Sequence, residues 1–227
     1  MKRVLLSWSS GKDATWTLRA LRHEPGVDVV GLLTTLNGTH DRVAMHAVRR
    51  SLLRLQAEAV GLPVREVDLP WPCSNDDYER IMAGVYQEAV ADGVTHLAFG
   101  DLFLDDVRRY RIDRLRGTGI EPLFPLWGLD TTVLAREMVD AGLEAVLTCV
   151  DPGQLDPGFV GRAFDQALLD QLPVGVDPCG ERGEFHTFVH AGPMFARPLA
   201  VRVGERVERD SFHFADVRVT PARSPGS

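Results

Sequence analysis

The sequence predicts an α/β fold in which helices cover both faces of a mainly parallel sheet. Over residues 1–150, short apolar runs alternate with segments whose apolar side chains recur at helical spacing. Strands joined by helices in this way form right-handed crossovers, which place the strands parallel. A length of 227 residues with 44% hydrophobic residues is enough for a buried core. Ligands of such sheets bind at the carboxyl ends of the strands.

The elements of this first region follow from apolar spacing and from stop signals. Pro, Gly and Asn/Asp residues mark the ends of the segments, and a Pro-rich turn is expected around Pro122 and Pro125. The expected strands are 4–6, 27–36, 64–69, 95–99 and 145–150. The expected helices are 14–21, 48–59, 75–89, 105–116 and 132–141.

The character of the chain changes after Val150, where two Asp-Pro-Gly turns follow. We expect a short helix over 159–172 and antiparallel strands over 185–189 and 201–207, the latter folded about Gly204. The residues 221–227 read as a disordered tail. We therefore divide the chain into a domain over 1–130, a smaller α+β region over 131–220, and the tail.

Composition narrows the function classes. A net charge of -7 argues against nucleic acid as a partner, because such binding depends on basic surface. No segment approaches 18 apolar residues, so no membrane span is expected. The three cysteines (Cys73, Cys149 and Cys179) form no paired motif, which favours a reduced compartment, and we expect a cytoplasmic protein.

The loop after the first strand carries the strongest chemical signal. Its residues are Ser9, Ser10, Gly11, Lys12 and Asp13. A Gly/Ser-rich turn between a strand and a helix directs backbone N–H groups and the helix dipole at one point, which suits a phosphate. Only two of the 25 basic residues are lysine, and a compact ammonium at Lys12 suits phosphate better than a broad guanidinium. The alternative is a serine-rich turn that only caps the helix.

This loop is not a Walker A loop, because Asp13 follows Gly11-Lys12 where Ser or Thr is required. It resembles the pyrophosphate loop, SGGxDS, of ATP pyrophosphatases, in which the loop binds the departing phosphates. Ser9, Gly11 and Asp13 match this motif, whereas Ser10 replaces a Gly and Ala14 replaces the final Ser.

Two further segments extend the resemblance to the diphthine–ammonia ligase family, over roughly residues 3–190. They are the Gly100-Asp101 pair at the end of the fourth expected strand and the segment 179–187, which reads CGERGEFHT. The resemblance implies a Rossmann-like domain of the adenine nucleotide α-hydrolase (HUP) type over 1–130, which binds ATP. It also implies that residues 131–220 form a substrate-binding region.

The reaction implied by the resemblance activates a carboxylate as its acyl adenylate, after which ammonia displaces AMP and leaves an amide. The partners would be ATP, ammonium and a carboxylate on a small molecule or a modified protein side chain. A homodimer is compatible with the sequence, which does not decide the oligomeric state. The implied ATP-binding residues are Ser9, Ser10, Gly11, Lys12, Asp13 and Gly100. Asp13 and Asp101 would hold Mg²⁺, which prefers oxygen ligands.

Three residues of the second region complete the expected catalytic set of Asp13, Asp101, Glu181, Glu184 and His186. A carboxylate can hold ammonium and accept its proton, and histidine transfers protons near neutral pH. The alternative for each of these three residues is a solvated side chain in a turn with no role in catalysis. His40 and His46 follow the second strand, and we do not count them among the site residues.

Two other functions compete with the ligase. A regulator that binds ATP without turnover is compatible with Ala14 in the loop. A tRNA-modifying enzyme with the same loop would normally show basic surface or paired cysteines, and neither is visible in this sequence.

Overall fold

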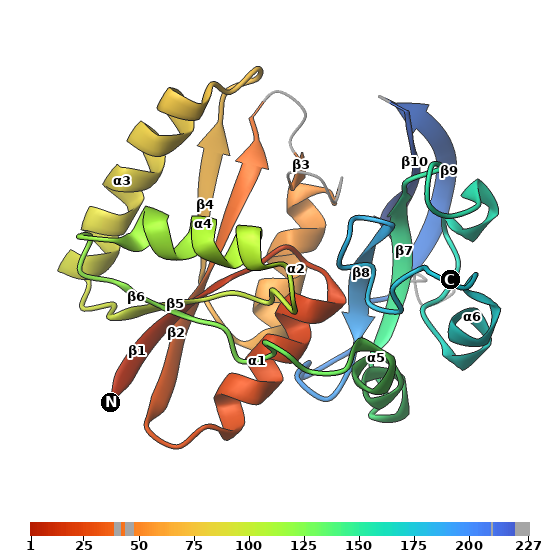
Figure 1. Cartoon of the computed structure of the whole chain (residues 1–227), viewed down its shortest axis with the longest axis horizontal. Helices are drawn as coiled ribbons and strands as arrows, with labels where there is room; N and C mark the ends of the chain where they lie inside the picture. The colour runs from red at the N-terminus through yellow and green to blue at the C-terminus, as the bar shows by residue number, and fades with distance from the viewer. Residues whose placement is uncertain (39–41, 44–47, 210, 221–227) are drawn as a thin grey trace, which may run out of the picture.

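The computed structural model describes residues 1–38, 42–43, 48–209 and 211–220, and it confirms the predicted α/β fold class. The predicted tail 221–227, His40 and His46 lie outside the described residues. Figure 1 shows two sheets side by side, the first built from the N-terminal part of the chain and the second from the C-terminal part.

The first sheet has β1 at its centre. β2 and β5 pair with β1 in parallel, β4 pairs in parallel with β2, and β6 with β5. The short β3 pairs antiparallel with the end of β2. These strands are β1 (Lys2–Ser7), β2 (Val27–Asn37), β3 (Arg42–Val43), β4 (Val64–Leu69), β5 (His96–Ala98) and β6 (Glu121–Leu123). Because the chain leaves β1 and β5 toward opposite sides of the sheet, their carboxyl ends form the point where ligands bind in such folds.

Helices cover both faces of this sheet, as predicted. The alternation of β1 shows the two faces: Val4 and Leu6 belong to one buried cluster, and Leu5 to another. The first cluster includes apolar residues of α1 and α2 and continues into the second sheet, whereas the second includes residues of α3 and α4. These helices are α1 (Lys12–His23), α2 (Arg50–Val60), α3 (Asn75–Ala91) and α4 (Asp105–Leu115).

The second sheet is antiparallel, with the order β8-β7-β10-β9. The alternating pattern predicts β7 as one more strand of the parallel sheet, but β7 pairs with β8 and β10 instead. The elements of this region are α5 (Thr131–Asp140), β7 (Glu144–Val150), the 3-10 turn η1 (Pro157–Phe159), α6 (Gln166–Gln171), β8 (Phe185–Ala191), β9 (Val201–Arg209) and β10 (Phe212–Val219).

Three local expectations were wrong. The helix over 159–172 is reduced to η1 and α6, because residues 162–164 pair with β7, where Phe164 N donates to Ala145 O at 2.8 Å. The strand pair does not fold about Gly204, which lies within the continuous β9. A Cβ at Gly204 would come within 2.9 Å of the carbonyl oxygen of Asp216 on β10, so this glycine permits a close approach of two strands. Pro122 lies in β6, which tolerates proline because it is an edge strand.

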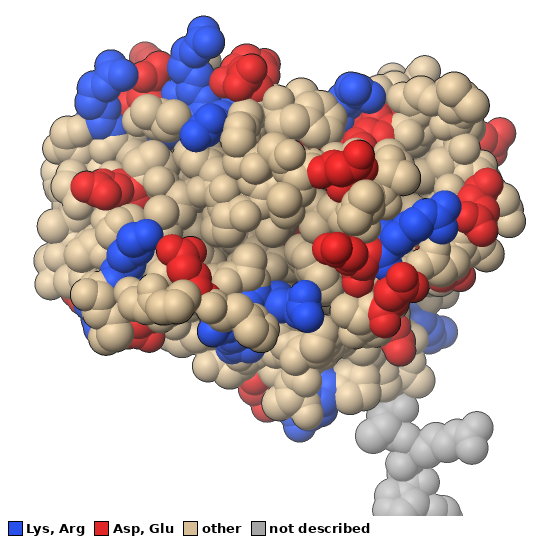
Figure 2. All heavy atoms as spheres, turned by 60° about the horizontal axis from the view of Figure 1, so that its bottom comes forward, with Lys and Arg blue, Asp and Glu red and all other residues tan. Residues whose placement is uncertain are grey.

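No helix within the described ranges is long and apolar enough to cross a membrane. Basic and acidic side chains are interspersed on the face that Figure 2 brings forward, and neutral residues occupy most of its centre. This face therefore offers no continuous basic field of the kind that attracts a phosphate backbone.

Candidate active site

The loop after β1 ends at the first turn of α1, as the sequence predicts. Ser9 Oγ accepts from the backbone N–H of Gly11 at 3.4 Å, and Gly11 is the N-cap residue of α1. Gly11 has no side chain to cap the helix, and Thr187 Oγ1 accepts from Lys12 N at 3.1 Å. The α1 dipole therefore makes the loop attractive to an anion.

Ser10 lies at the position where the pyrophosphate-loop motif has glycine, and its backbone explains the preference. Its φ is 71°, in the left-handed region that favours glycine. Its carbonyl oxygen accepts from Val189 N of β8 at 3.0 Å and from Gln56 Nε2 of α2 at 3.1 Å. The Ser10 side chain is fully buried, and its hydroxyl has no hydrogen-bond partner among the described residues. Ser10 thus fastens the loop to both regions of the chain through its backbone.

Gly100 brings the end of β5 against the same loop. A Cβ at Gly100 would lie 3.0 Å from the carbonyl carbon of Asp13 and 3.1 Å from the nitrogen of Ala14. A side chain here would require the loop backbone to move by a few tenths of an ångström, because contacts of 3.0–3.4 Å are tighter than nine in ten real Cβ contacts. Gly100 therefore permits β5 to approach the loop this closely.

Asp101 follows in the same turn and lies near Arg111 of α4. Its Oδ2 is 3.5 Å from Arg111 Nε, but this atom has no hydrogen-bond partner among the described residues. Burial raises the pKa of Asp101, and the Arg111 charge opposes that shift. An under-satisfied buried carboxylate is suited to a cation.

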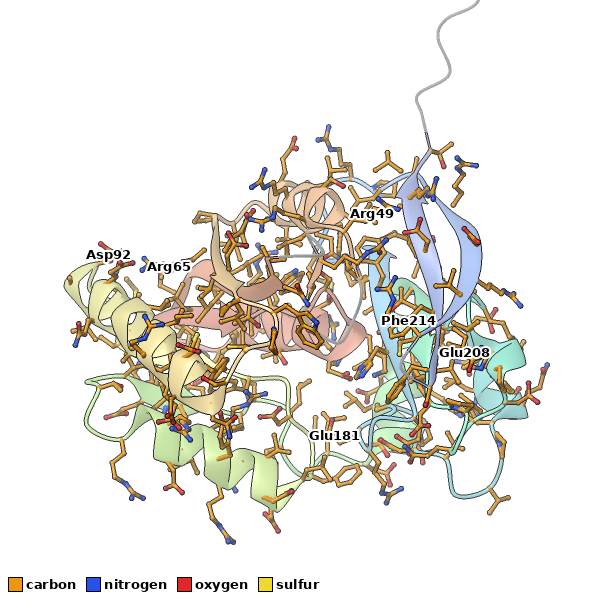
Figure 3. The ribbon with its side chains drawn as sticks, turned by 90° about the horizontal axis from the view of Figure 1, so that it is seen from above. Arg49, Arg65, Asp92, Glu181, Glu208 and Phe214 are labelled. Carbon is orange, nitrogen blue, oxygen red and sulfur yellow. The ribbon has the colours of Figure 1, made fainter. Side chains whose placement is uncertain are left out.

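The turn that precedes β8 brings the second region into the site. Glu181 Oε1 accepts from Leu102 N, one residue beyond Asp101, at 2.7 Å. Asp177 Oδ2 accepts from Glu181 N at 2.9 Å. Figure 3 shows Glu181 between the two sheets, where the turn meets the loop that follows β5. A residue 79 positions away in the sequence from Leu102 is thus held next to the expected ATP site.

Glu184 is buried against the backbone of the turn. Its side chain is 1% exposed, and its two oxygens accept from Asp177 N and Arg182 N, each at 2.9 Å. It therefore holds the turn that carries Glu181 by satisfying the N–H groups of the turn.

Two adjoining cavities lie over the carboxyl ends of β1 and β5. The first, of about 250 Å³, brings together most of the predicted site residues: Ser9, Lys12, Asp13, Gly100, Asp101, Glu181 and His186. The second, of about 300 Å³, extends toward α3 and α4 and is lined by apolar and aromatic side chains that include Leu33, Tyr78, Met82 and Tyr86. Ser7, Ser9, Phe99, Arg111 and His186 line both cavities. Ser10, Gly11 and Glu184 line neither.

Burial changes the protonation of two of these groups in opposite directions. It raises the pKa of Glu181 to about 7, although the hydrogen bond from Leu102 opposes the shift and the charges of Asp13 and Asp101 add to it. It lowers the pKa of His186 to about 4, with a smaller contribution from the Lys12 charge. At neutral pH, Glu181 can therefore accept or give a proton, whereas His186 is a neutral imidazole.

A preformed metal centre is not present: across the described ranges, no group of three or more His, Cys, Asp or Glu side chains is placed to hold an ion. Both oxygens of Asp13 accept from Lys12 Nζ, at 3.0 and 2.8 Å. Asp13 and Asp101 nevertheless line one cavity, and Mg²⁺ is commonly held by one or two carboxylates together with substrate phosphates. The donor set is compatible with Mg²⁺ brought in by a nucleotide.

Gln56 is a structural residue of the site that the sequence reasoning missed. It is fully buried on α2, accepts from Trp8 Nε1 at 3.0 Å and donates to the carbonyl oxygens of Ser10 and Val189. One sequence signal was available, because Gln56 follows Leu52 by four residues and so interrupts the apolar face of the helix.

Comparison with known proteins covers nearly the whole chain. The model of the diphthamide synthase N-terminal domain matches residues 1–121, and that of the diphthamide synthase C-terminal domain matches residues 130–219. The chain is 28% identical over 240 residues to the diphthine–ammonia ligase of Danio rerio, covering 95% of this chain and 92% of that protein. It is 27% identical over 242 residues to the human diphthine–ammonia ligase, covering 95% and 88%. It is 30% identical over 237 residues to the Schizosaccharomyces pombe protein of the same name, covering 92% of this chain and 38% of that protein.

Proposed function

Because the chain belongs to the diphthamide synthase family, we propose that it is an ATP-dependent ligase that joins ammonia to a carboxylate and forms an amide. One observation carries the proposal: Glu181, with a pKa raised to about 7, lines the same cavity as the pyrophosphate-type loop and Asp101. The proposed phosphate site would thus lie beside a group that can deprotonate ammonium. The proposed division is an ATP-binding domain over 1–130 and a substrate-binding region over 131–220.

The two cavities suit the two ends of ATP. The triphosphate would lie in the 250 Å³ cavity, against the first turn of α1 and the loop. The nucleoside would lie in the 300 Å³ cavity, where aromatic and apolar side chains can contact the base. Arg111, which lines both cavities and whose guanidinium carbon lies 4.9 Å from the Phe99 ring centre, is placed near the junction. Its charge would favour a phosphate or the substrate carboxylate there.

In the first step, a carboxylate oxygen of the substrate attacks the α-phosphorus of ATP, and the bond to the β-phosphate oxygen breaks. The acyl adenylate forms and pyrophosphate leaves. The α1 dipole would stabilise the charge that collects on the pyrophosphate. When bound, Mg²⁺ would neutralise charge on the phosphate oxygens, and Asp101 and Asp13 are the residues that would hold it.

In the second step, ammonium gives one proton to Glu181, and the resulting ammonia attacks the acyl carbon. The bond from that carbon to the AMP oxygen breaks, a second proton leaves for solvent, and the amide and AMP are released. Burial of Glu181 makes its carboxylate a stronger base than an ordinary glutamate, which favours the proton transfer. We assign neutral His186 to hydrogen bonding with the substrates, and Glu184 to positioning the turn.

Product analysis tests the proposal. The protein is supplied with ATP, an ammonium salt and a panel of carboxylates that includes diphthine, and the nucleotide products are separated. AMP and pyrophosphate in equal amounts support adenylation. ADP would indicate a different transfer, and tight ATP binding without turnover would favour a regulator.

Asp13→Asn tests the site within the same assay, with Asp113→Asn as the control. The Asp113 side chain is 51% exposed on α4. We expect Asp13→Asn to reduce AMP formation by about 100-fold or more, because the substitution removes one of the charges proposed to hold the metal. Wild-type turnover by Asp13→Asn would exclude the assigned site.

A further inference from the structure

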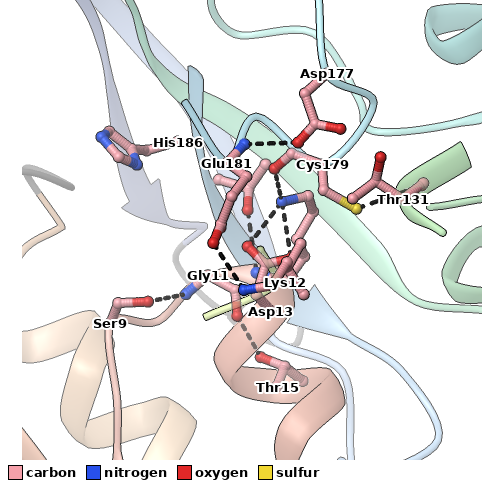
Figure 4. Close-up of polar contacts among 12 residues, drawn as sticks. Ser9, Gly11, Lys12, Asp13, Thr15, Thr131, Asp177, Cys179, Glu181 and His186 are labelled. Atoms are coloured by element: carbon pink, nitrogen blue, oxygen red, sulfur yellow. Dashed lines mark hydrogen bonds and ion pairs between the residues drawn. The ribbon is translucent and has the colours of Figure 1, made fainter. Parts of the chain in front are cut away.

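The side chain of Lys12 is almost completely buried, although the residue lies in the loop expected to hold phosphates. It is 2% exposed. Its Nζ donates to both oxygens of Asp13, at 3.0 and 2.8 Å, and to the carbonyl oxygen of Cys179 in the second region (Figure 4). The ring centres of Phe164 and Phe185 lie 5.7 and 5.5 Å from the same atom.

These contacts use the hydrogen-bond donors of the Lys12 ammonium group. A lysine has three N–H donors, and three protein oxygens lie within hydrogen-bonding distance of Nζ. The protein's own oxygens therefore satisfy the N–H donors of Lys12 Nζ.

The backbone of the loop also contacts β8, the strand that follows this turn. Lys12 N donates to Thr187 Oγ1 at 3.1 Å, and Ser10 O accepts from Val189 N. Cys179 precedes Glu181 by two residues, and Thr187 follows it by six. The loop is thus joined to the chain on both sides of Glu181.

From this arrangement we infer that Lys12 is a positioning residue that fastens the turn carrying Glu181 to the nucleotide loop, and not a ligand of the triphosphate. The inference rests on the proposed function of Glu181 in the ammonia step. It also explains the residue type. The chain uses lysine only at Lys2 and Lys12 among 25 basic residues, and a compact ammonium fits between two aromatic rings and three oxygens where a planar guanidinium would not.

A positioning role and a phosphate-binding role predict different losses in Lys12→Met. If Lys12 positions Glu181, the Kd for ATP measured by calorimetry changes by less than about 3-fold. Carboxylate-dependent exchange of pyrophosphate into ATP, which reports the first step, falls by less than about 10-fold. Amide formation falls by about 100-fold, because a displacement near 1 Å has an effect of this size. Lys12→Arg does not restore it.

Lys2→Met is the matched control, because the Lys2 side chain is 42% exposed and pairs with Glu24 on the surface. It should leave all three measurements unchanged. Weaker ATP binding by about 30-fold in Lys12→Met, with amide formation restored at saturating ATP, would overturn the inference. Equal loss of both half-reactions would also overturn it, because a general structural defect reduces both.

Thr187→Val serves if Lys12→Met does not fold. It removes the acceptor of the Lys12 N–H and leaves the buried ion pair with Asp13 intact. A selective loss of amide formation supports the inference, and unchanged half-reactions contradict it. If the wild-type protein catalyses neither half-reaction, the proposed function fails, and the ATP affinity of Lys12→Met still decides whether Lys12 binds phosphate.

Discussion

Gly100→Ala tests whether the close approach of β5 to the nucleotide loop determines the shape of the site. The new Cβ would lie 3.0 Å from the Asp13 carbonyl carbon, 3.1 Å from the Ala14 nitrogen and 3.2 Å from the Asp13 oxygen. Ordinary van der Waals contact begins near 3.4 Å, so the backbone must move by a few tenths of an ångström. All three atoms are backbone atoms at the start of α1, and they cannot rotate away as a side chain can.

The expected loss of stability follows from this overlap. Forcing extra atoms into a packed site typically costs about 1–3 kcal/mol. For a chain of this length, a loss of about 2 kcal/mol lowers the Tm by about 4–8 °C. ATP affinity should fall as well, because the displaced atoms belong to the turn that is proposed to face the phosphates.

Gly84→Ala is the matched control. Gly84 lies inside α3, and a Cβ there would meet nothing within 4 Å. Alanine is favoured over glycine in a helix interior by about 1 kcal/mol, so this variant should raise the Tm by about 2–4 °C and leave ATP binding unchanged. Thermal unfolding and calorimetric ATP titration of both variants measure these effects. Wild-type Tm and ATP affinity in Gly100→Ala would refute the reasoning.

Glu181 and Ala14 give two further predictions. Since burial raises the folded-state pKa of Glu181 to about 7, its contribution to stability is fully present below its ordinary pKa and is lost as pH rises through 7. Glu181→Gln removes this dependence. Between pH 4.5 and 8, the free energy of unfolding of the variant should therefore rise relative to that of the wild type by at most about 3 kcal/mol, and by less because Glu181 is partly exposed. Urea unfolding at both pH values measures this difference, and the same pH dependence in both proteins would contradict the prediction. Ala14→Ser should tighten ATP binding about 3- to 10-fold, because it adds a hydroxyl to the cavity. The neighbouring hydroxyls do not replace it, since Thr15 Oγ1 and Thr17 Oγ1 already donate to the carbonyl oxygens of Gly11 and Asp13. Unchanged affinity in a calorimetric titration, with Ala83→Ser on exposed α3 as the control, would show that no phosphate oxygen lies there.

The sequence by itself determined those helices and strands that are specified by residues close together in the chain. Apolar spacing and stop signals placed β1, α1, β2, α2 and β4 close to their observed bounds, because one strand or helix is specified by its own periodicity. The motif at Ser9–Asp13 identified the loop, and its left-handed position at Ser10 agrees with the glycine found there in the pyrophosphate-loop motif.

Only the tertiary structure decided which segments meet. The pairing of β7 with β8 and β10 depends on residues far apart in the chain, so local periodicity could not separate it from the parallel sheet. The same holds for Gly204, whose requirement comes from the carbonyl of Asp216 on the next strand and not from a turn.

The roles of the charged residues were likewise undecided by sequence, because burial and partners set them. Glu181 and Glu184 lie three residues apart, yet one faces the cavity with a pKa near 7 and the other is buried on backbone N–H groups. Lys12 and Cys179 are separated by 167 residues and meet through a single carbonyl oxygen. The sequence therefore determined that a Gly/Ser-rich loop forms after β1, and the packing of the second sheet against that loop decided what each of its side chains contacts.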